Sequence, residues 1–196
     1  VPAASSCTFS VNVMLTSVGT VQNTIPTGAI TSDQGVSNTL PTQTSLSVGS
    51  NLGITKVFTP AVVRPNETSR LRIQLINPAA NQVTNLQVTD TLPVGVVIAA
   101  APNPFTNCVD ATVAVAPGGG SVGVSGGRLA AASGGVSSTC YAEVDVIATA
   151  TGTYHNNIPS GGLTGLVGGA PVSNPVPADA TLQVRTPLTL AKEAGI

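Results

Sequence analysis

Lys56, Asp90 and Asn156 are polar, yet each lies in a segment where every second residue is apolar. Successive side chains of a β-strand point to opposite faces, so each of the three is expected to point inward with its apolar neighbours. These neighbours are Leu52, Ile54 and Phe58 for Lys56; Leu86, Val88 and Leu92 for Asp90; and Val144, Val146, Tyr154 and Ile158 for Asn156. An unpaired buried polar group is costly, so the three side chains are expected to satisfy one another.

A lysine, a carboxylic acid and an asparagine in an apolar core are the reactants of an intramolecular isopeptide bond. Desolvation lowers the pKa of a buried lysine and frees its amine as a nucleophile. A protonated Asp90 would then polarise the Asn156 amide, and ammonia would leave. Two other interpretations stay open: a hydrogen-bonded Lys56–Asp90 pair without a covalent bond, and a Lys56 side chain that extends its ammonium outward.

The composition favours strands and turns and argues against several classes of function. Of the 196 residues, 42% are hydrophobic but only 3% are aromatic and 8% are charged, against roughly 25% charged in an average soluble domain. The net charge of −1 and the lack of a basic cluster give no reason to expect nucleic acid as a partner. The longest apolar run, Leu92 to Ala101, is too short to cross a bilayer as a helix. Such a charge-poor chain suits an extracellular location.

The chain repeats itself with a period of about 136 residues. Cys7, Asn23 and Lys56 recur as Cys140, Asn156 and Lys192, and the strings around them match continuously except in one loop. We therefore expect residues 1–49 to be the C-terminal part of one repeat, 52–185 to be a complete repeat, and 186–196 to be the first strand of the next.

Alternation and turn residues predict many short strands and no helix. Such a pattern is typical of a β-sandwich with Greek-key connections. The Gly- and Pro-rich stretch 159–178 is expected to be a long loop or an irregular edge. The expected strands are 7–15, 20–25, 44–48, 52–58, 69–76, 83–90, 95–100, 111–115, 121–124, 139–148, 153–158, 180–184 and 188–192.

Several strings resemble the tandem immunoglobulin-like "conserved repeat" domains of large bacterial surface and adhesin-like proteins, a group of uncharacterised function. They are Ile54-Thr55-Lys56-Val57-Phe58-Thr59-Pro60, Leu75-Ile76-Asn77-Pro78, Val88-Thr89-Asp90-Thr91-Leu92-Pro93-Val94-Gly95, Ser138-Thr139-Cys140, Gly152-Thr153-Tyr154-His155-Asn156 and Ile158-Pro159-Ser160-Gly161. The resemblance implies immunoglobulin-like β-sandwich repeats in tandem. It implies no general set of catalytic residues, and fold alone does not fix function.

Cys108 and Cys140 both fall in the expected complete repeat, and an oxidising location would make them a disulfide. Cys7 occupies the place of Cys140, so its partner is expected upstream of Val1. Free buried thiols remain the alternative. No metal site is expected, because cysteine and histidine do not occur at ligand spacing.

Other motifs carry weaker signals. His155 is the only histidine, and Gln22 holds its place in the neighbouring repeat, which argues against a Ser/His/Asp triad. Gly118-Gly119-Gly120 reads as a hairpin turn, because it lacks the Lys and Ser/Thr of a phosphate-binding loop. The scattered carboxylates argue against a built calcium site. Asn66-Glu67-Thr68 is a glycosylation sequon of a kind that is common by chance.

These observations predict a non-enzymatic structural repeat of an extracellular, cell-surface stalk, sheath or fibre, without a cofactor. Its partners would be neighbouring repeats or copies of itself. One alternative is a filament protomer that assembles by strand complementation, because an incomplete sandwich exposes unpaired edges. Another is an adhesin or ligand-binding module that uses the 101–110 and 159–178 loops to contact a host or matrix surface.

Overall fold

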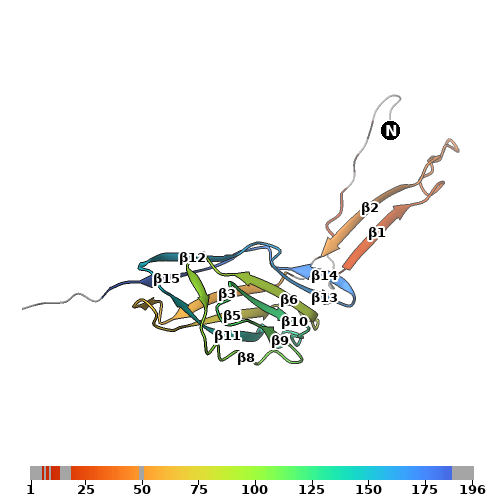
Figure 1. The fold of residues 1–196 in the computed structure, drawn as a ribbon. Coiled ribbons are helices and arrows are strands. Elements are labelled where there is room, and N and C mark those ends of the chain that lie inside the picture. Colours follow the sequence, from red (N-terminus) through yellow and green to blue (C-terminus); the bar gives the residue numbers. More distant parts are fainter. Residues whose placement is uncertain (1–5, 7, 9, 14–18, 49–50, 187–196) are drawn as a thin grey trace, which may run out of the picture. The chain divides into compact units, whose positions relative to one another are not determined.

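The computed structural model describes residues 6, 8, 10–13, 19–48 and 51–186. The chain divides into two compact units, residues 1–49 and residues 50–196, which we call the N-terminal unit and the main unit. Every regular element among the described residues is a β-strand (Figure 1). The all-β prediction is therefore confirmed.

The N-terminal unit contains one antiparallel hairpin of β1 (Gly19–Ile25) and β2 (Thr42–Val48). The predicted strand over 7–15 is wrong for residues 8 and 10–13, which lie in no strand, while 7, 9, 14 and 15 fall outside the described residues. Their equivalents in the main unit lie in a strand that pairs with residues 69–77. The described part of the N-terminal unit offers no such partner, and a strand needs one to satisfy its backbone groups.

The first sheet of the main unit has the strand order β3-β5-β11-β7, with β8 also paired to β11. Its strands alternate apolar and polar residues, so one face is buried. The central pair, β5 and β11, is antiparallel from Ser138 opposite Asn77 to Val146 opposite Ser69. The bounds are β3 Gly53–Thr59, β5 Ser69–Asn77, β7 Val96–Ile98, β8 Phe105–Thr106 and β11 Ser138–Ala148.

The second sheet has the order β14-β13-β6-β10-β9 and packs its apolar face against the first, which makes the main unit an immunoglobulin-like β-sandwich. The bounds are β6 Thr84–Thr91, β9 Thr112–Ala114, β10 Ser121–Ser125, β13 Leu163–Val167 and β14 Ala170–Ser173. The core is aliphatic, as the composition predicts. Its fully buried members include Leu71, Ile73, Leu75, Leu86, Ile98, Leu129, Ile158, Leu163 and Leu182.

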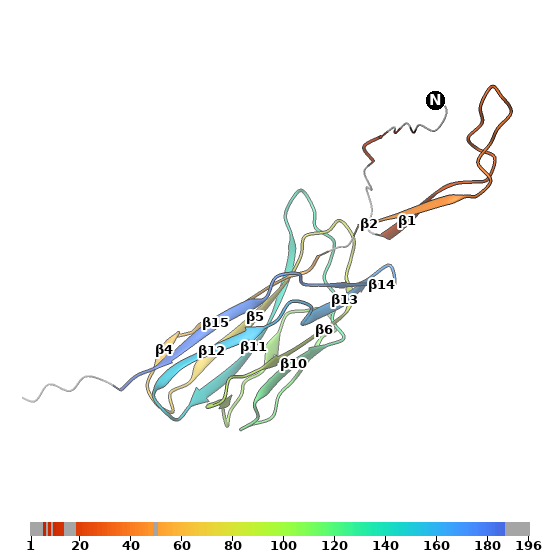
Figure 2. The same cartoon turned by 90° about the horizontal axis from the view of Figure 1, so that it is seen from above.

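A third sheet, with the order β12-β15-β4, runs along the side of this sandwich (Figure 2). It comprises β12 (Gly152–Ile158), β15 (Ala178–Val184) and β4 (Val62–Val63). β15 lies beside β3, and β12 lies beside β6. β4 follows β3 in the chain and pairs in parallel with the end of β15. The third sheet therefore lies beside β3, an edge strand of the first sheet, and β6, the middle strand of the second.

The stretch 159–178 contains a hairpin, β13–β14, so the prediction of a long loop there is wrong. The alternative prediction, an irregular edge, agrees with the place of β14 as the outermost strand of its sheet and with the register shift between Thr164 and Leu166. Gly165 lies so close to Val83 that a Cβ atom would come within 2.6 Å of Val83 Cγ1. Gly168 and Gly169, both with positive φ, form the turn. These glycines, which led to the prediction of irregular structure, therefore allow close packing and a tight turn. The predicted strand 188–192 lies outside the described residues.

Candidate functional site

Lys56 lies in the middle of β3 and points into the main unit. β3 alternates buried and exposed residues, and Lys56 shares its buried face with Leu52, Ile54 and Phe58. Its side chain has 0% exposed surface. The predicted inward orientation of Lys56 is thus found in the structure, and its ammonium does not extend outward.

Asp90 links Lys56 and Asn156 by hydrogen bonds, and the three residues lie on strands of three different sheets. Lys56 Nζ donates a hydrogen bond of 2.7 Å to Asp90 Oδ1. Asn156 Nδ2 donates one of 3.0 Å to Asp90 Oδ2. The structure therefore brings β3, β6 and β12 together at one carboxyl group, whose two oxygens bridge the lysine and the asparagine. We call these three residues the buried triad.

Burial favours the unprotonated form of Lys56. Loss of solvent lowers the pKa of Lys56 from its ordinary value, and this effect outweighs the opposing attraction of Asp90 and Asp179. A lysine with a lowered pKa more readily gives up its proton, and the unprotonated amine is a nucleophile.

Asn156 Oδ1 has no hydrogen-bond partner, which sets it apart from the other buried side-chain nitrogen and oxygen atoms in the described part of the chain. The residue is only 1% exposed, so solvent does not compensate. Buried polar groups are nearly always satisfied, and leaving one unpaired costs about 1–3 kcal/mol. The amide of Asn156 is therefore held by one end only.

Cys108 and Cys140 form a disulfide with an S–S distance of 2.02 Å. Cys108 follows β8, and Cys140 lies near the start of β11, the strand with which β8 pairs. Both residues are buried. Cys7 lies outside the described residues, so its partner remains a prediction.

A second polar cluster, which the sequence did not reveal, lies across β5 and β11. Arg70 Nη1 donates a hydrogen bond of 2.9 Å to Asp145, and Arg72 Nε donates one of 2.5 Å to Glu143. The guanidinium of Arg72 also lies 4.0 Å from the centre of the Tyr141 ring. These groups are partly exposed and form ion pairs between β5 and β11 on one face of the sheet. We therefore assign them a structural role.

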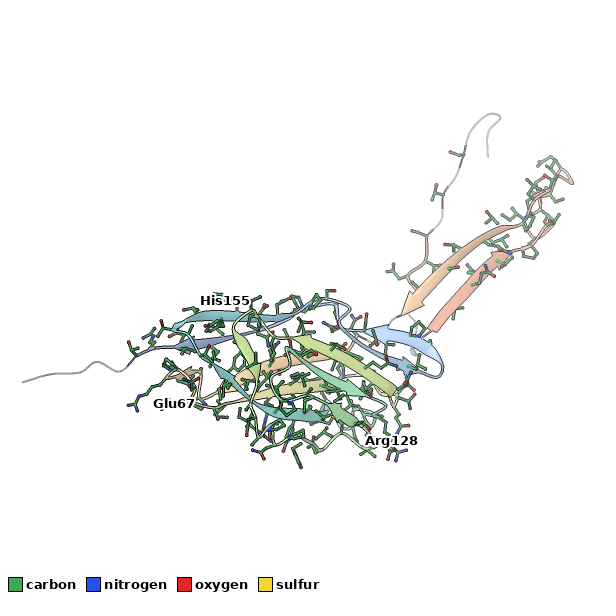
Figure 3. All side chains as sticks on the ribbon, in the orientation of Figure 1. Glu67, Arg128 and His155 are labelled. Carbon is green, nitrogen blue, oxygen red and sulfur yellow. A yellow bond between two sulfur atoms is a disulfide. The ribbon has the colours of Figure 1, made fainter. Side chains whose placement is uncertain are left out.

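The weaker sequence candidates do not converge on a reactive site. His155 is exposed, with Nδ1 3.2 Å from Thr181 Oγ1 (Figure 3). Asn66 adopts a φ of 67° in the turn before β5. Gly118-Gly119-Gly120 connects the paired strands β9 and β10. Within the described residues no group of three His, Cys, Asp or Glu side chains is placed to hold a metal ion. No helix there is long and apolar enough to span a membrane.

The expected repeats have matching local structure. β1 pairs with β2 from Gly19 opposite Val48 to Ile25 opposite Thr42. β12 pairs with β15 from Gly152 opposite Val184 to Ile158 opposite Ala178. Every pair in the first hairpin thus has its sequence equivalent in the second. Asn23 takes the place of Asn156 but is exposed, and Lys192 lies outside the described residues.

One asparagine of each unit repeats the match at the level of side chains. Asn38 Nδ2 donates to the carbonyls of Pro26 and Leu40, and its Oδ1 accepts from the backbone N–H of Ile30. Asn174 Nδ2 donates to Pro159 and Val176, and its Oδ1 accepts from Leu163. All six partners are equivalent in the alignment of the two segments.

A family model described as DUF7933, a domain of unknown function, matches residues 53–184. This match spans more than half of the chain. No curated protein is significantly similar in sequence.

Several solved structures are distantly similar. BcpA, the major pilin subunit of Bacillus cereus, is 10% identical with a TM-score of 0.45; the match covers 85% of this chain and 48% of the pilin. The collagen-binding domain of a Staphylococcus aureus adhesin is 13% identical with a TM-score of 0.37, covering 70% and 99%. A putative membrane anchored protein of Corynebacterium diphtheriae is 14% identical with a TM-score of 0.40, covering 94% and 48%. None of these likenesses assigns a function.

Proposed function

The chain belongs to the DUF7933 family, whose function is unknown, and we propose that it is a non-enzymatic structural repeat of an extracellular bacterial surface stalk, sheath or fibre. The complete repeat is residues 52–185, with 1–49 and 186–196 as parts of its neighbours. Each repeat would contribute length and rigidity.

The observation that carries this proposal is the shared hydrogen-bond pattern of Asn38 and Asn174. The three hydrogen-bond partners of Asn38 are equivalent to the three of Asn174, and the strand register of the β1–β2 hairpin recurs in β12–β15. A serially repeated building block accounts for both units with one set of folding rules. The Cys108–Cys140 disulfide adds support for an extracellular location, because disulfides persist in oxidising compartments.

Immunogold electron microscopy of the producing cells tests this proposal. Antibody raised against residues 1–196 is expected to place gold along extended material outside the cell. Antibody absorbed beforehand with the same chain serves as the control and removes the labelling. Gold confined to the cell interior would overturn the proposal.

A filament protomer is a second candidate, favoured by the apolar surface of the N-terminal unit. Ile30, Val36 and Leu46 are 53%, 67% and 40% exposed. Their equivalents Leu163, Val172 and Leu182, which the main unit packs, are 0%, 6% and 0% exposed. A strand supplied by another chain would cover such residues.

Sedimentation of residues 1–196 over a range of concentrations, beside residues 50–196 alone, separates this candidate from the first. A filament protomer assembles as the concentration rises, and removal of the N-terminal unit abolishes the assembly. A monomer at every concentration excludes it.

A further inference from the structure

We propose that the main unit closes a covalent bond on itself: an amide between Lys56 Nζ and Asn156 Cγ, formed without a partner enzyme and with Asp90 as the proton-transfer group. The bond joins β3 to β12, and Lys56 and Asn156 form the modification site. It goes beyond the structural role proposed above and does not depend on it.

The reactants are already assembled. The two oxygens of Asp90 hold the Lys56 amine at 2.7 Å and the Asn156 amide at 3.0 Å. The side chains of Lys56 and Asp90 have 0% exposure, and Asn156 is 1% exposed. Holding a nucleophile and its target on one rigid group replaces an encounter between them by a unimolecular step.

The proton moves first. Lys56 passes one proton along its hydrogen bond to Asp90, which leaves a neutral amine and a neutral carboxylic acid. Burial favours this exchange because it removes two charges from an apolar environment. The lowered pKa of Lys56 is in keeping with it.

The acid then activates the amide. Rotation of the Asn156 amide about its Cβ–Cγ bond exchanges the positions of Oδ1 and Nδ2, so that protonated Asp90 donates to Oδ1. This gives the atom that lacks a partner in the structure a donor, and it draws electrons from Cγ. The unpaired oxygen thus has a role in the chemistry.

The bond-forming step balances without a co-reactant. Lys56 Nζ attacks Cγ, the Cγ–Nδ2 bond breaks, and Nδ2 leaves as ammonia with the proton that Nζ gives up. Asp90 remains a carboxylic acid that donates to the new carbonyl. No oxidation, metal or nucleotide is involved. The enclosed site keeps water from competing with the amine.

Intact-mass measurement and peptide mapping of residues 1–196 test the proposal. The mass is expected to be lower than that of the sequence by one molecule of ammonia, beyond the hydrogens lost to the disulfide. After reduction and trypsin digestion, the peptide that ends at Arg70 should be joined to the peptide that begins at Leu129. Lys56 should resist cleavage, because trypsin needs a free lysine.

The variants Lys56→Met, Asp90→Asn and Asn156→Ala should each keep the full mass. Asn157→Ala is the matched control: it removes the adjacent exposed asparagine and should leave the cross-link intact. Asn156→Ala keeps the Lys56–Asp90 pair, so it also serves where loss of that pair impairs folding in the other two variants.

Two outcomes would overturn the proposal. One is a wild-type chain at its full mass. The other is loss of ammonia with no joined peptide, because an asparagine that cyclises onto its own backbone loses ammonia too. The joined peptide in the wild-type chain decides between these chemistries without reference to any variant.

Discussion

Lys56 Nζ lies 2.7 Å from Asp90 Oδ1, and both side chains are completely shielded from solvent. Burial lowers the pKa of Lys56, so there is a pH range in which the unfolded chain holds the lysine proton and the folded chain has lost it. Stability rises with pH wherever the unfolded state binds more protons. The structure thus predicts that the free energy of unfolding rises with pH in any chain in which Lys56 is unmodified.

The Asn156→Ala variant, which keeps a free Lys56, tests this. Its free energy of unfolding should rise with pH between the lowered pKa of Lys56 and the ordinary value of 10.5. The double variant Lys56→Met/Asn156→Ala should lack the rise, because it has no Lys56 to lose a proton. Asp90 and Asp179 are present in both variants, so they do not account for the difference. Denaturant titrations at a series of pH values measure it, and parallel curves for the two variants would contradict it.

Loss of the disulfide should weaken the main unit substantially. Cys108 and Cys140 are separated by 32 residues, and closing a loop of that length contributes about 3–4 kcal/mol in the chain-entropy treatment. The variant Cys108→Ala/Cys140→Ala should therefore show that loss in denaturant unfolding. Both it and its reference carry Cys7→Ser to prevent mixed disulfides; equal stability of the two chains would argue against the bond.

Gly165→Ala should destabilise the β13–β14 hairpin. The new Cβ would lie 2.6 Å from Val83 Cγ1 and 3.3 Å from the Thr84 carbonyl, and overpacking of this kind costs about 1–3 kcal/mol. Gly120→Ala is the control, since a Cβ there meets no atom within 4 Å. In thermal unfolding, Gly165→Ala should lower the Tm, whereas Gly120→Ala should leave it unchanged.

Asn174→Ala should cost more than Asn38→Ala, although the two residues make equivalent bonds. Asn174 is 1% exposed, so its removal takes the bonding partner away from the Leu163 N–H and the Val176 carbonyl, at about 1–3 kcal/mol for a buried group. The Pro159 carbonyl still accepts from the Gly162 N–H. Asn38 lies in the N-terminal unit, and water can reach its hydrogen-bond partners. Unfolding of the main unit should respond to the first change and not to the second.

The inward-facing polar residues were predictable because alternation is local. Lys56, Asp90 and Asn156 each sit among apolar residues at a spacing of two, which fixes their faces without knowledge of the fold. Their convergence followed from the cost of leaving them unpaired. Their distances, and the unpaired oxygen of Asn156, depend on how three sheets meet, which no local pattern contains.

Other features were hidden because they depend on non-local register. Arg70 and Arg72 meet Glu143 and Asp145 only because β5 and β11 pair as they do, and nothing in either segment sets that register alone. The β13–β14 hairpin was missed for a different reason. Gly165 is required by the approach of Val83, a residue distant in sequence, and in isolation it reads as a strand breaker.

The course of β3 and β15 determines how the main unit would carry a load. Leu52, just before β3, donates its N–H to the Ser173 carbonyl, whereas Arg185, just after β15, donates to Val63 beyond the other end of β3. The chain thus enters at one pole and leaves at the opposite pole. Tension between these points acts parallel to the strands, so the hydrogen bonds between neighbouring strands bear the load at the same time. In a unit with both ends at one pole, these bonds would break one after another.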